Sequence, residues 1–218
     1  MKWSNSKQFE KAPAGSHLAR CYMVVDLGTQ PRAFQGVTHL ERQVRLAFEL
    51  PTEKMEGLYD DKSKGRPFSV GQNCKQSLHP KANLRKLLVG WRGRDFKDAA
   101  EVEAFDPKKL VGLPVRINLV ESGEYMNIAS LAPVGKAEKM PKAINKPVYL
   151  SLDPEEFDKA VYDSLHKGMQ DKIAASPEYK AMFGGDDGAS QDDADPTGEG
   201  AAQAAANDAA ADSDNVPF

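Results

Sequence analysis

Basic and aromatic residues stand at alternate positions in several strand-like stretches of the sequence. The alternation places them opposite the apolar face, because successive side chains of a strand point to opposite sides. Cations that follow phosphates, together with aromatic faces on which unpaired bases stack, are the mixture that single-stranded nucleic acid requires. The pattern therefore predicts a surface that recognises unpaired strands rather than base sequence. Its residues are Arg20, Tyr22, Arg45, Lys75, Arg116 and Tyr125.

Two polar segments add candidates for phosphate contacts. The loop at 51–66 carries three cations that could close over a bound strand: Lys62, Lys64 and Arg66. The motif WRGRDF at 91–96 carries Arg92 and Arg94 near the end of an expected helix. These two arginines could cap the last helical carbonyls or contact phosphate, and the sequence leaves both roles open. Trp91 continues an apolar helical stripe and is expected in the core.

Residue patterns typical of catalysis or metal binding are missing. The sequence has no phosphate-cradling glycine loop, no H-x-E with C-x-x-C and no G-x-S-x-G. The acidic groups at Asp60-Asp61 and around Asp95 to Glu101 alternate with basic residues, as on a solvated surface. Cys21 and Cys74 form no C-x-x-C pair and are expected as small buried residues without a disulfide. We therefore expect no enzyme activity, no metal and no cofactor.

The charge of the chain divides into two parts. Residues 184–218 contain nine acidic residues and no Lys or Arg, among Ala, Gly, Gln and Ser. Such a segment buries too little apolar surface to offset chain ordering, so a disordered acidic tail is expected. The overall charge is −3, but residues 1–183 hold 29 Lys and Arg against 23 (32 minus 9) acidic residues, a net charge of +6. A basic body favours a polyanionic partner.

The tail ends in DSDNVPF, residues 212–218. An aromatic ring beside a free carboxylate can be held by an apolar pocket and a basic clamp on another protein. We therefore expect a partner-binding tip made of Asp212, Asp214, Val216, Pro217 and Phe218.

The elements that must position these residues follow a recognisable order. Five strands are expected, with two helices inserted between the third and the fourth. This is the order of an OB-fold barrel, whose strand face and loops commonly hold oligonucleotides. The expected strands are 17–28, 37–50, 67–78, 114–120 and 124–134, and the helices are 80–93 and 97–104. The fold class is thus mainly β: a five-stranded OB-fold barrel with a helical insert, a C-terminal helix and a disordered acidic tail.

Strict alternation assigns side chains to the two faces of the first two strands. On the first, Ala19, Cys21, Met23, Val25 and Leu27 are expected on one face. On the second, Leu40, Val44, Leu46, Phe48 and Leu50 are expected inward, and Gln43, Arg45 and Glu49 outward.

The sequence divides into four regions. They are an N-terminal arm (1–14) with Trp3 and Phe9 as possible anchors, the barrel (15–134), a linker and helical segment (135–183), and the tail (184–218). In the third region one helix is expected at 153–175, capped by Asp153-Pro154-Glu155-Glu156. Its apolar stripe favours packing on the barrel, and binding of a partner protein stays open as the alternative.

Two stretches of the body, LHPKANLRKLLVGWRGRDF and LVGLPVRINLVESGEYMNIASLAPV, resemble the single-stranded DNA-binding proteins of tailed bacteriophages and their prophages. That resemblance covers roughly residues 15–134, and the tip resembles that of bacterial-type single-stranded DNA-binding proteins. It implies coating of unwound DNA in phage replication and recombination, and recruitment of replication, recombination and repair proteins through the tip. The body departs from the bacterial pattern, so a monomer or dimer is expected instead of the usual tetramer.

Two alternatives remain open at this point. One is a recombination mediator or annealing protein organised as rings or filaments. The other is a non-catalytic protein-interaction scaffold whose tail serves solubility. The sequence has no apolar run of 18 residues and no signal-peptide core, which predicts a soluble protein in the cytoplasm, that of a bacterial host if the protein is phage-encoded.

Overall fold

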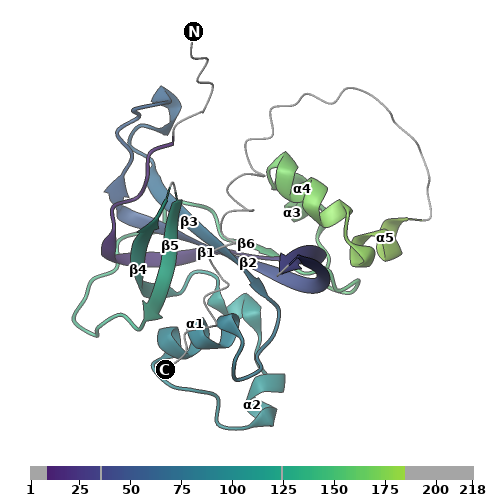
Figure 1. Ribbon diagram of the computed structural model, residues 1–218. Helices are drawn as coiled ribbons and strands as arrows, with labels where there is room; N and C mark the ends of the chain where they lie inside the picture. The colour runs from purple at the N-terminus through teal and green to yellow at the C-terminus, as the bar shows by residue number, and fades with distance from the viewer. Residues whose placement is uncertain (1–8, 35, 124, 185–218) are drawn as a thin grey trace.

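The computed structural model describes residues 9–34, 36–123 and 125–184, and six strands form its single sheet (Figure 1). The strand order is β3-β2-β1-β4-β5, and neighbours along this path pair antiparallel. β6 pairs parallel with β1. Within the described residues, β3 and β5 contact each other without a strand pairing, so the sheet is open. The strands are β1 (Gly15–Phe34), β2 (Val37–Lys54), β3 (Pro67–Lys75), β4 (Pro114–Ser122), β5 (Tyr125–Ala132) and β6 (Val148–Leu150). All five expected strands are confirmed, and β6 is additional.

The main core lies between the curved sheet and the inserted helices. β2 contributes the even-numbered residues Val44, Leu46, Phe48 and Leu50, as its alternation predicts. Cys21 and Cys74 are both buried in this core, which confirms their expected burial. The expectation for Leu40 is wrong: its side chain is 72% exposed because the β1–β2 hairpin extends beyond the core there.

Two register shifts break the alternation of β1. The first lies between Cys21 and Met23 and the second between Asp26 and Gly28. Each is a β-bulge, which adds one residue to a strand and changes the face of the residues that follow. Ala19 and Cys21 therefore face the main core together with Val24, whereas Val25 and Leu27 belong to a second core. The expectation that all odd residues of this strand share one face is wrong.

The helical insert contains the two expected helices and lies between the third and fourth strands, as expected. α1 (Asn83–Arg92), α2 (Ala99–Glu103) and the short 3-10 turn η2 (Pro107–Leu110) lie between β3 and β4. A second 3-10 turn, η1 (Asp61–Ser63), lies between β2 and β3. α1 packs against β3 and β5 below the sheet in Figure 1. Trp91 is buried, its ring contacts Phe48, and its indole N–H donates to the carbonyl of Pro114 at 2.8 Å. The expected core role of Trp91 is confirmed.

Replacing Gly90 by Ala should destabilise the protein, because α1 crosses β5 too closely for a side chain. A Cβ at residue 90 would lie 2.4 Å from the carbonyl oxygen of Leu131, a backbone atom that cannot rotate away. We expect a loss of about 2 kcal/mol in unfolding free energy, after the roughly 1 kcal/mol that Ala gains in helix propensity. Urea denaturation measures it. Gly135→Ala is the control, since its Cβ would make only ordinary contacts at 3.5 Å. Equal stability of the two variants would contradict this account.

The C-terminal region forms a second core on the outer face of β1. β6 leads into α3 (Lys159–Ser164), α4 (Lys167–Ala174) and α5 (Pro177–Phe183), to the right of the sheet in Figure 1. Packing of this region on the sheet is confirmed. The buried residues are Val25, Leu27, Leu150, Leu152, Leu165, Met169 and Ile173.

The expected single helix at 153–175 is wrong. Leu165 (φ −72°, ψ 155°) and His166 (φ −66°, ψ 149°) are extended, which separates α3 from α4. Asp158, and not Asp153, caps the first helix by accepting from the N–H groups of Ala160 and Val161. No helix within the described part of the chain is long and apolar enough to cross a membrane.

Candidate nucleic-acid interface

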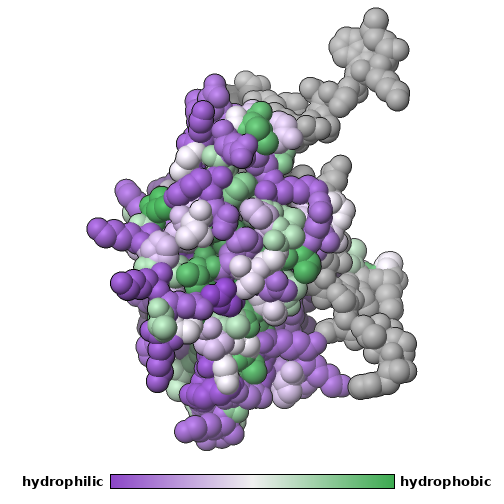
Figure 2. Space-filling model, turned by 90° about the vertical axis from the view of Figure 1, so that its left-hand side faces the viewer, coloured by the Kyte–Doolittle hydropathy of each residue, from purple (hydrophilic) through white to green (hydrophobic). Residues whose placement is uncertain are grey.

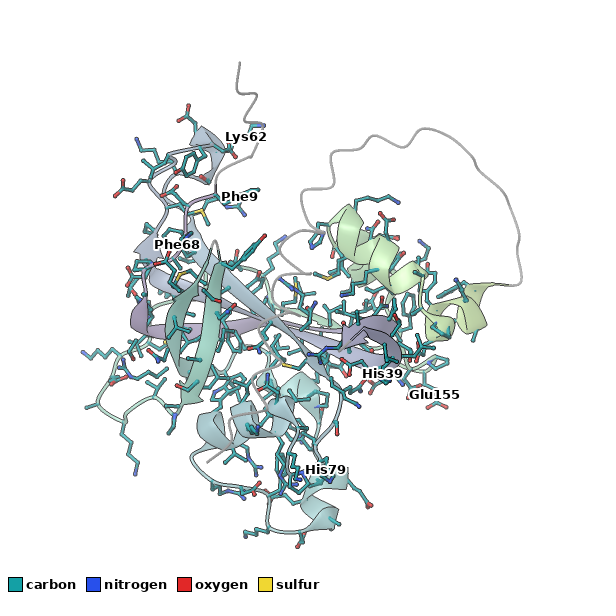
Figure 3. All side chains as sticks on the ribbon, in the orientation of Figure 1. Phe9, His39, Lys62, Phe68, His79 and Glu155 are labelled. Carbon is teal, nitrogen blue, oxygen red and sulfur yellow. The ribbon has the colours of Figure 1, made fainter. Side chains whose placement is uncertain are left out.

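The connection between β2 and β3 projects from the sheet as an arm, residues 55–66. Figure 3 places Lys62 at the far end of this arm, Phe9 beside it, and Phe68 where β3 leaves it. Lys62, Lys64 and Arg66 are exposed, and their side chains make no hydrogen bond or ion pair with any other described residue. Tyr59, also on the arm, is 55% exposed. The arm therefore offers three uncompensated cations and an accessible ring.

The N-terminal segment is bound to the arm through the side chain of Glu10. The Glu10 carboxylate accepts hydrogen bonds from the backbone N–H groups of Glu56 (2.7 Å), Gly57 (2.8 Å) and Leu58 (3.2 Å). Gly57 has φ 80°, a conformation that favours glycine, and a Cβ there would lie 2.8 Å from the Cβ of Lys64. Phe9 is exposed, so the anchor of this segment is Glu10 and not the expected Phe9, and Trp3 lies outside the described residues.

We expect the anchoring by Glu10 to fail only in acid. Partial burial raises the pKa of Glu10, but the three backbone hydrogen bonds lower it more, and the pKa lies below its ordinary value of 4.5. The carboxylate therefore stabilises the arm fully above about pH 4.5, and this contribution disappears as the pH falls through the lower folded-state pKa. An NMR titration of the Gly57 amide proton should show a midpoint below 4.5, absent in Glu10→Gln. A midpoint at or above 4.5 would refute the contact.

Beyond the arm, β3 presents its odd-numbered residues on the outer face of the sheet. These are Ser69, Gly71, Asn73 and Lys75, opposite the core residues Phe68, Val70 and Cys74. Ser69 and Lys75 are exposed. Asn73 is buried, and its Nδ2 has no hydrogen-bond partner among the described residues.

Arg45 of β2 lies across this face. It pairs in register with Asn73, and its Nη1 donates to Asn73 Oδ1 at 3.0 Å. A Cβ at Gly71 would lie 2.6 Å from Nη2 of Arg45, so the absent side chain makes room for the guanidinium. The structure thus brings together two candidates of the sequence analysis, Arg45 and Lys75, in line with the arm cations. We call this set the track: Lys62, Lys64, Arg66, Ser69, Gly71, Asn73 and Lys75, with Arg45.

Arg20 has a different environment from the one expected. It points away from the core, but its guanidinium donates to the carbonyls of Gly112 (2.9 Å) and Pro141 (2.8 Å) and lies 3.9 Å from the Glu49 carboxylate. Glu49 is completely buried. The outward positions at Gln43 and Glu49 are likewise covered, which corrects their expected exposure. Tyr22 sits at the first bulge and is partly buried.

The arginines of WRGRDF hold the two inserted helices together. Arg92 and Arg94 both donate to the Glu101 carboxylate, Arg94 at 2.6 Å. The hydrogen bond from Arg94, with those from the Lys97 N–H and Arg92, lowers the pKa of Glu101 to about 2. The helix is capped by Gly93 in the left-handed conformation instead of by an arginine side chain. Lys75 and Arg94 remain more than half exposed beside their acidic partners.

The remaining candidates lie apart from the track. Arg116 of β4 donates to Glu138 at 2.6 Å and to Ser16 Oγ at 3.2 Å. Tyr125 begins β5 and is partly buried. They lie on β4 and β5, outside the strand and arm that form the track. The tip residues Asp212, Asp214, Val216, Pro217 and Phe218 lie outside the described residues.

The track includes residues that sequence reasoning missed as site residues. Ser69 and Asn73 share the parity of Lys75, and this shared parity was the available signal. Tyr59 had no periodic pattern to mark it. Figure 2 shows the left-hand side of Figure 1, where hydrophilic side chains project from top to bottom and hydrophobic residues form only small separate patches.

Comparisons with protein families, with curated proteins and with solved structures find no match to this chain. The function must therefore be inferred from the chemistry of the track and from the sequence of the chain.

Proposed function

We propose that the chain is a non-catalytic protein that binds single-stranded DNA without sequence specificity along the track. The observation that carries this proposal is the continuity of the track over one segment, residues 62–75. Three cations without partners among the described residues lead into a strand face that holds Ser69, Arg45 and Lys75. Cations and hydroxyl donors can contact phosphate and sugar oxygens in any base sequence.

The proposed preference of the protein for unpaired strands rests on the exposed ring of Tyr59. Its ring is exposed on the arm beside the cations, and it can stack only on a base that has left the duplex. Lysine and arginine side chains alone would bind duplex DNA as well. The combination of ring and cations supports a site for single strands.

The barrel that we propose for this fold is of the OB type. β1 pairs with both β2 and β4, the helices α1 and α2 lie between β3 and β4, and β3 contacts β5. Closure between β3 and β5 would complete the barrel. OB folds bind oligonucleotides on the face of strands 2 and 3, and the β3 part of the track, with Arg45 of β2, would lie on that face.

The biological setting that we propose rests on the sequence. The protein would coat unwound DNA during phage replication and recombination, as a monomer or dimer. The acidic tail would compete with DNA for the basic body, and the tip from Asp212 to Phe218 would recruit partner enzymes.

The proposal is tested by fluorescence titration of labelled oligo-dT and of a matched duplex, at low and moderate salt. We expect tight, salt-sensitive binding to the single strand and much weaker binding to the duplex. A chain ending at Phe183 should bind more tightly than the full chain, because the competing acids are gone. Equal affinity for duplex would contradict the proposed preference, and no binding to either would favour the scaffold alternative.

Replacing Tyr59 by Ala should weaken oligo-dT binding by about tenfold, since base–aromatic stacking contributes roughly 1–3 kcal/mol per base. Tyr59→Phe keeps the ring and should bind as the wild type does. Leu58→Ala is a matched control, because Leu58 is a neighbouring exposed apolar residue without a π face. If Tyr59→Ala and Leu58→Ala have the same affinity, stacking on Tyr59 does not occur.

A further inference from the structure

We infer that the connector, residues 134–147 between β5 and β6, forms a second side of the track and contacts phosphates through Lys142 and Lys146. This inference rests on the proposed function, because it assigns further residues to the same DNA site. The connector passes at the left of the sheet in Figure 1, on the side that faces the viewer in Figure 2.

The connector has no regular secondary structure, yet it is fixed at two points on the sheet. Arg20 of β1 donates to the carbonyl of Pro141 at 2.8 Å. The buried carboxylate of Glu49 on β2 accepts from the N–H groups of Ile144 (3.1 Å) and Asn145 (2.7 Å). Backbone N–H groups of the connector thus bind the Glu49 carboxylate. Together with the contact between Arg20 and Pro141, these hydrogen bonds hold residues 141–145 against the outer face of the sheet.

The register of the strands places this anchor beside the track. Arg20 pairs with Glu49, and Glu49 pairs with Ser69, so these three residues form one row across β1, β2 and β3. Directly paired residues have Cβ atoms about 5 Å apart. The connector residues held by Glu49 therefore lie one strand away from Ser69, close to the point where the track passes from the arm to β3.

The lysine charges of the connector are exposed to solvent and are not paired with acidic side chains of the described residues. It carries Lys136, Lys139, Lys142 and Lys146, all exposed, and none makes an ion pair with another described residue. The single acid of the connector, Glu138, is already paired with Arg116 at 2.6 Å. Of the four connector lysines, Lys142 and Lys146 are the two that flank the residues held by Glu49.

Anchoring also explains how such lysines could contribute to affinity. A flexible segment loses conformational freedom when it binds, and a segment already fixed at its backbone loses less. The structure thus assigns to this place two exposed lysines on a held backbone.

The test compares K142Q/K146Q with K159Q/K167Q in oligo-dT titrations from 0.05 to 0.3 M salt. Both variants lose two positive charges, but Lys159 and Lys167 lie on α3 and α4 and are paired with Asp163 and Asp171. Each lost phosphate contact should reduce the slope of log K against log salt by about 0.7. We expect K142Q/K146Q to lose about 1.4 in slope and roughly 25-fold in affinity at 0.1 M salt, and the control to change little.

A second measurement uses the unmodified full chain. Amine acetylation followed by peptide mass spectrometry should show Lys142 and Lys146 protected by bound oligo-dT, and Lys159 and Lys167 unprotected. If the wild type binds oligo-dT but K142Q/K146Q matches its control and no protection appears, the inference fails while the proposed function stands. If the wild type does not bind oligo-dT, both fail together.

Discussion

Replacing Lys62, Lys64 and Arg66 by Gln is expected to weaken oligo-dT binding about 100-fold at 0.1 M salt. Each of these side chains is exposed on the arm and has no partner among the described residues, so each can release counterions from a phosphate. With about 0.7 counterion per contact on a single strand, three contacts contribute about 2 to the slope of log K against log salt. Fluorescence titration at several salt concentrations measures the affinity and the slope together.

A matched control separates local contacts from overall charge. K159Q/K167Q/K180Q removes the same three charges from α3, α4 and α5, and should leave the slope nearly unchanged. The folded state of both variants is checked by circular dichroism. If the two triple variants lose affinity equally, the body attracts DNA through net charge alone, and the arm is not a binding site.

Replacing Glu49 by Ala is expected to lower the free energy of unfolding by about 3–5 kcal/mol, the range for breaking a buried ion pair from one side. The carboxylate is completely buried, lies 3.9 Å from Arg20 Nε and accepts from two backbone N–H groups of the connector. Its removal leaves these donors without an acceptor in a site that water does not reach. Urea denaturation followed by circular dichroism measures the loss.

Two further variants test whether the loss comes from the buried contacts. Glu53→Ala removes a partly exposed carboxylate from the same strand, where it pairs with His17 at 3.2 Å, and should cost at most about 1 kcal/mol. Glu49→Gln keeps the size and one acceptor oxygen, and should fall between Glu49→Ala and the wild type. A cost below 1 kcal/mol for Glu49→Ala would show that the connector is not held by this residue.

The two cores limit the area of the face that we propose to bind DNA. The outer face of β1 is covered by β6 and the C-terminal helices, and Glu49 and Arg20 lie beneath the connector. On the β3 side of the sheet, Ser69 and Lys75 remain exposed. The proposed site follows β3 and its arm, with Arg45 of β2 and the connector beside it, and this arrangement suits a single extended chain of nucleotides better than the breadth of a duplex.

Much of the fold could be predicted from the sequence because it depends on neighbouring residues. The alternation Val44, Leu46, Phe48, Leu50 fixes which face of β2 is buried, and the i, i+3, i+4, i+7 spacing from Leu84 to Trp91 does the same for α1. The cations of the arm are also evident from the sequence, since a polar loop has nowhere to lie but the surface.

The tertiary structure alone decided which outward residues are available. Arg20 and Lys75 have the same pattern in the sequence, yet one is enclosed with Glu49 and Pro141 and the other is 61% exposed. The bulge at Tyr22 and the break at Leu165 are equally absent from local periodicity. The physical reason is that periodicity determines the face on which a side chain lies, whereas its exposure and ion-pair partners depend on segments that are distant in the sequence and meet it only after folding.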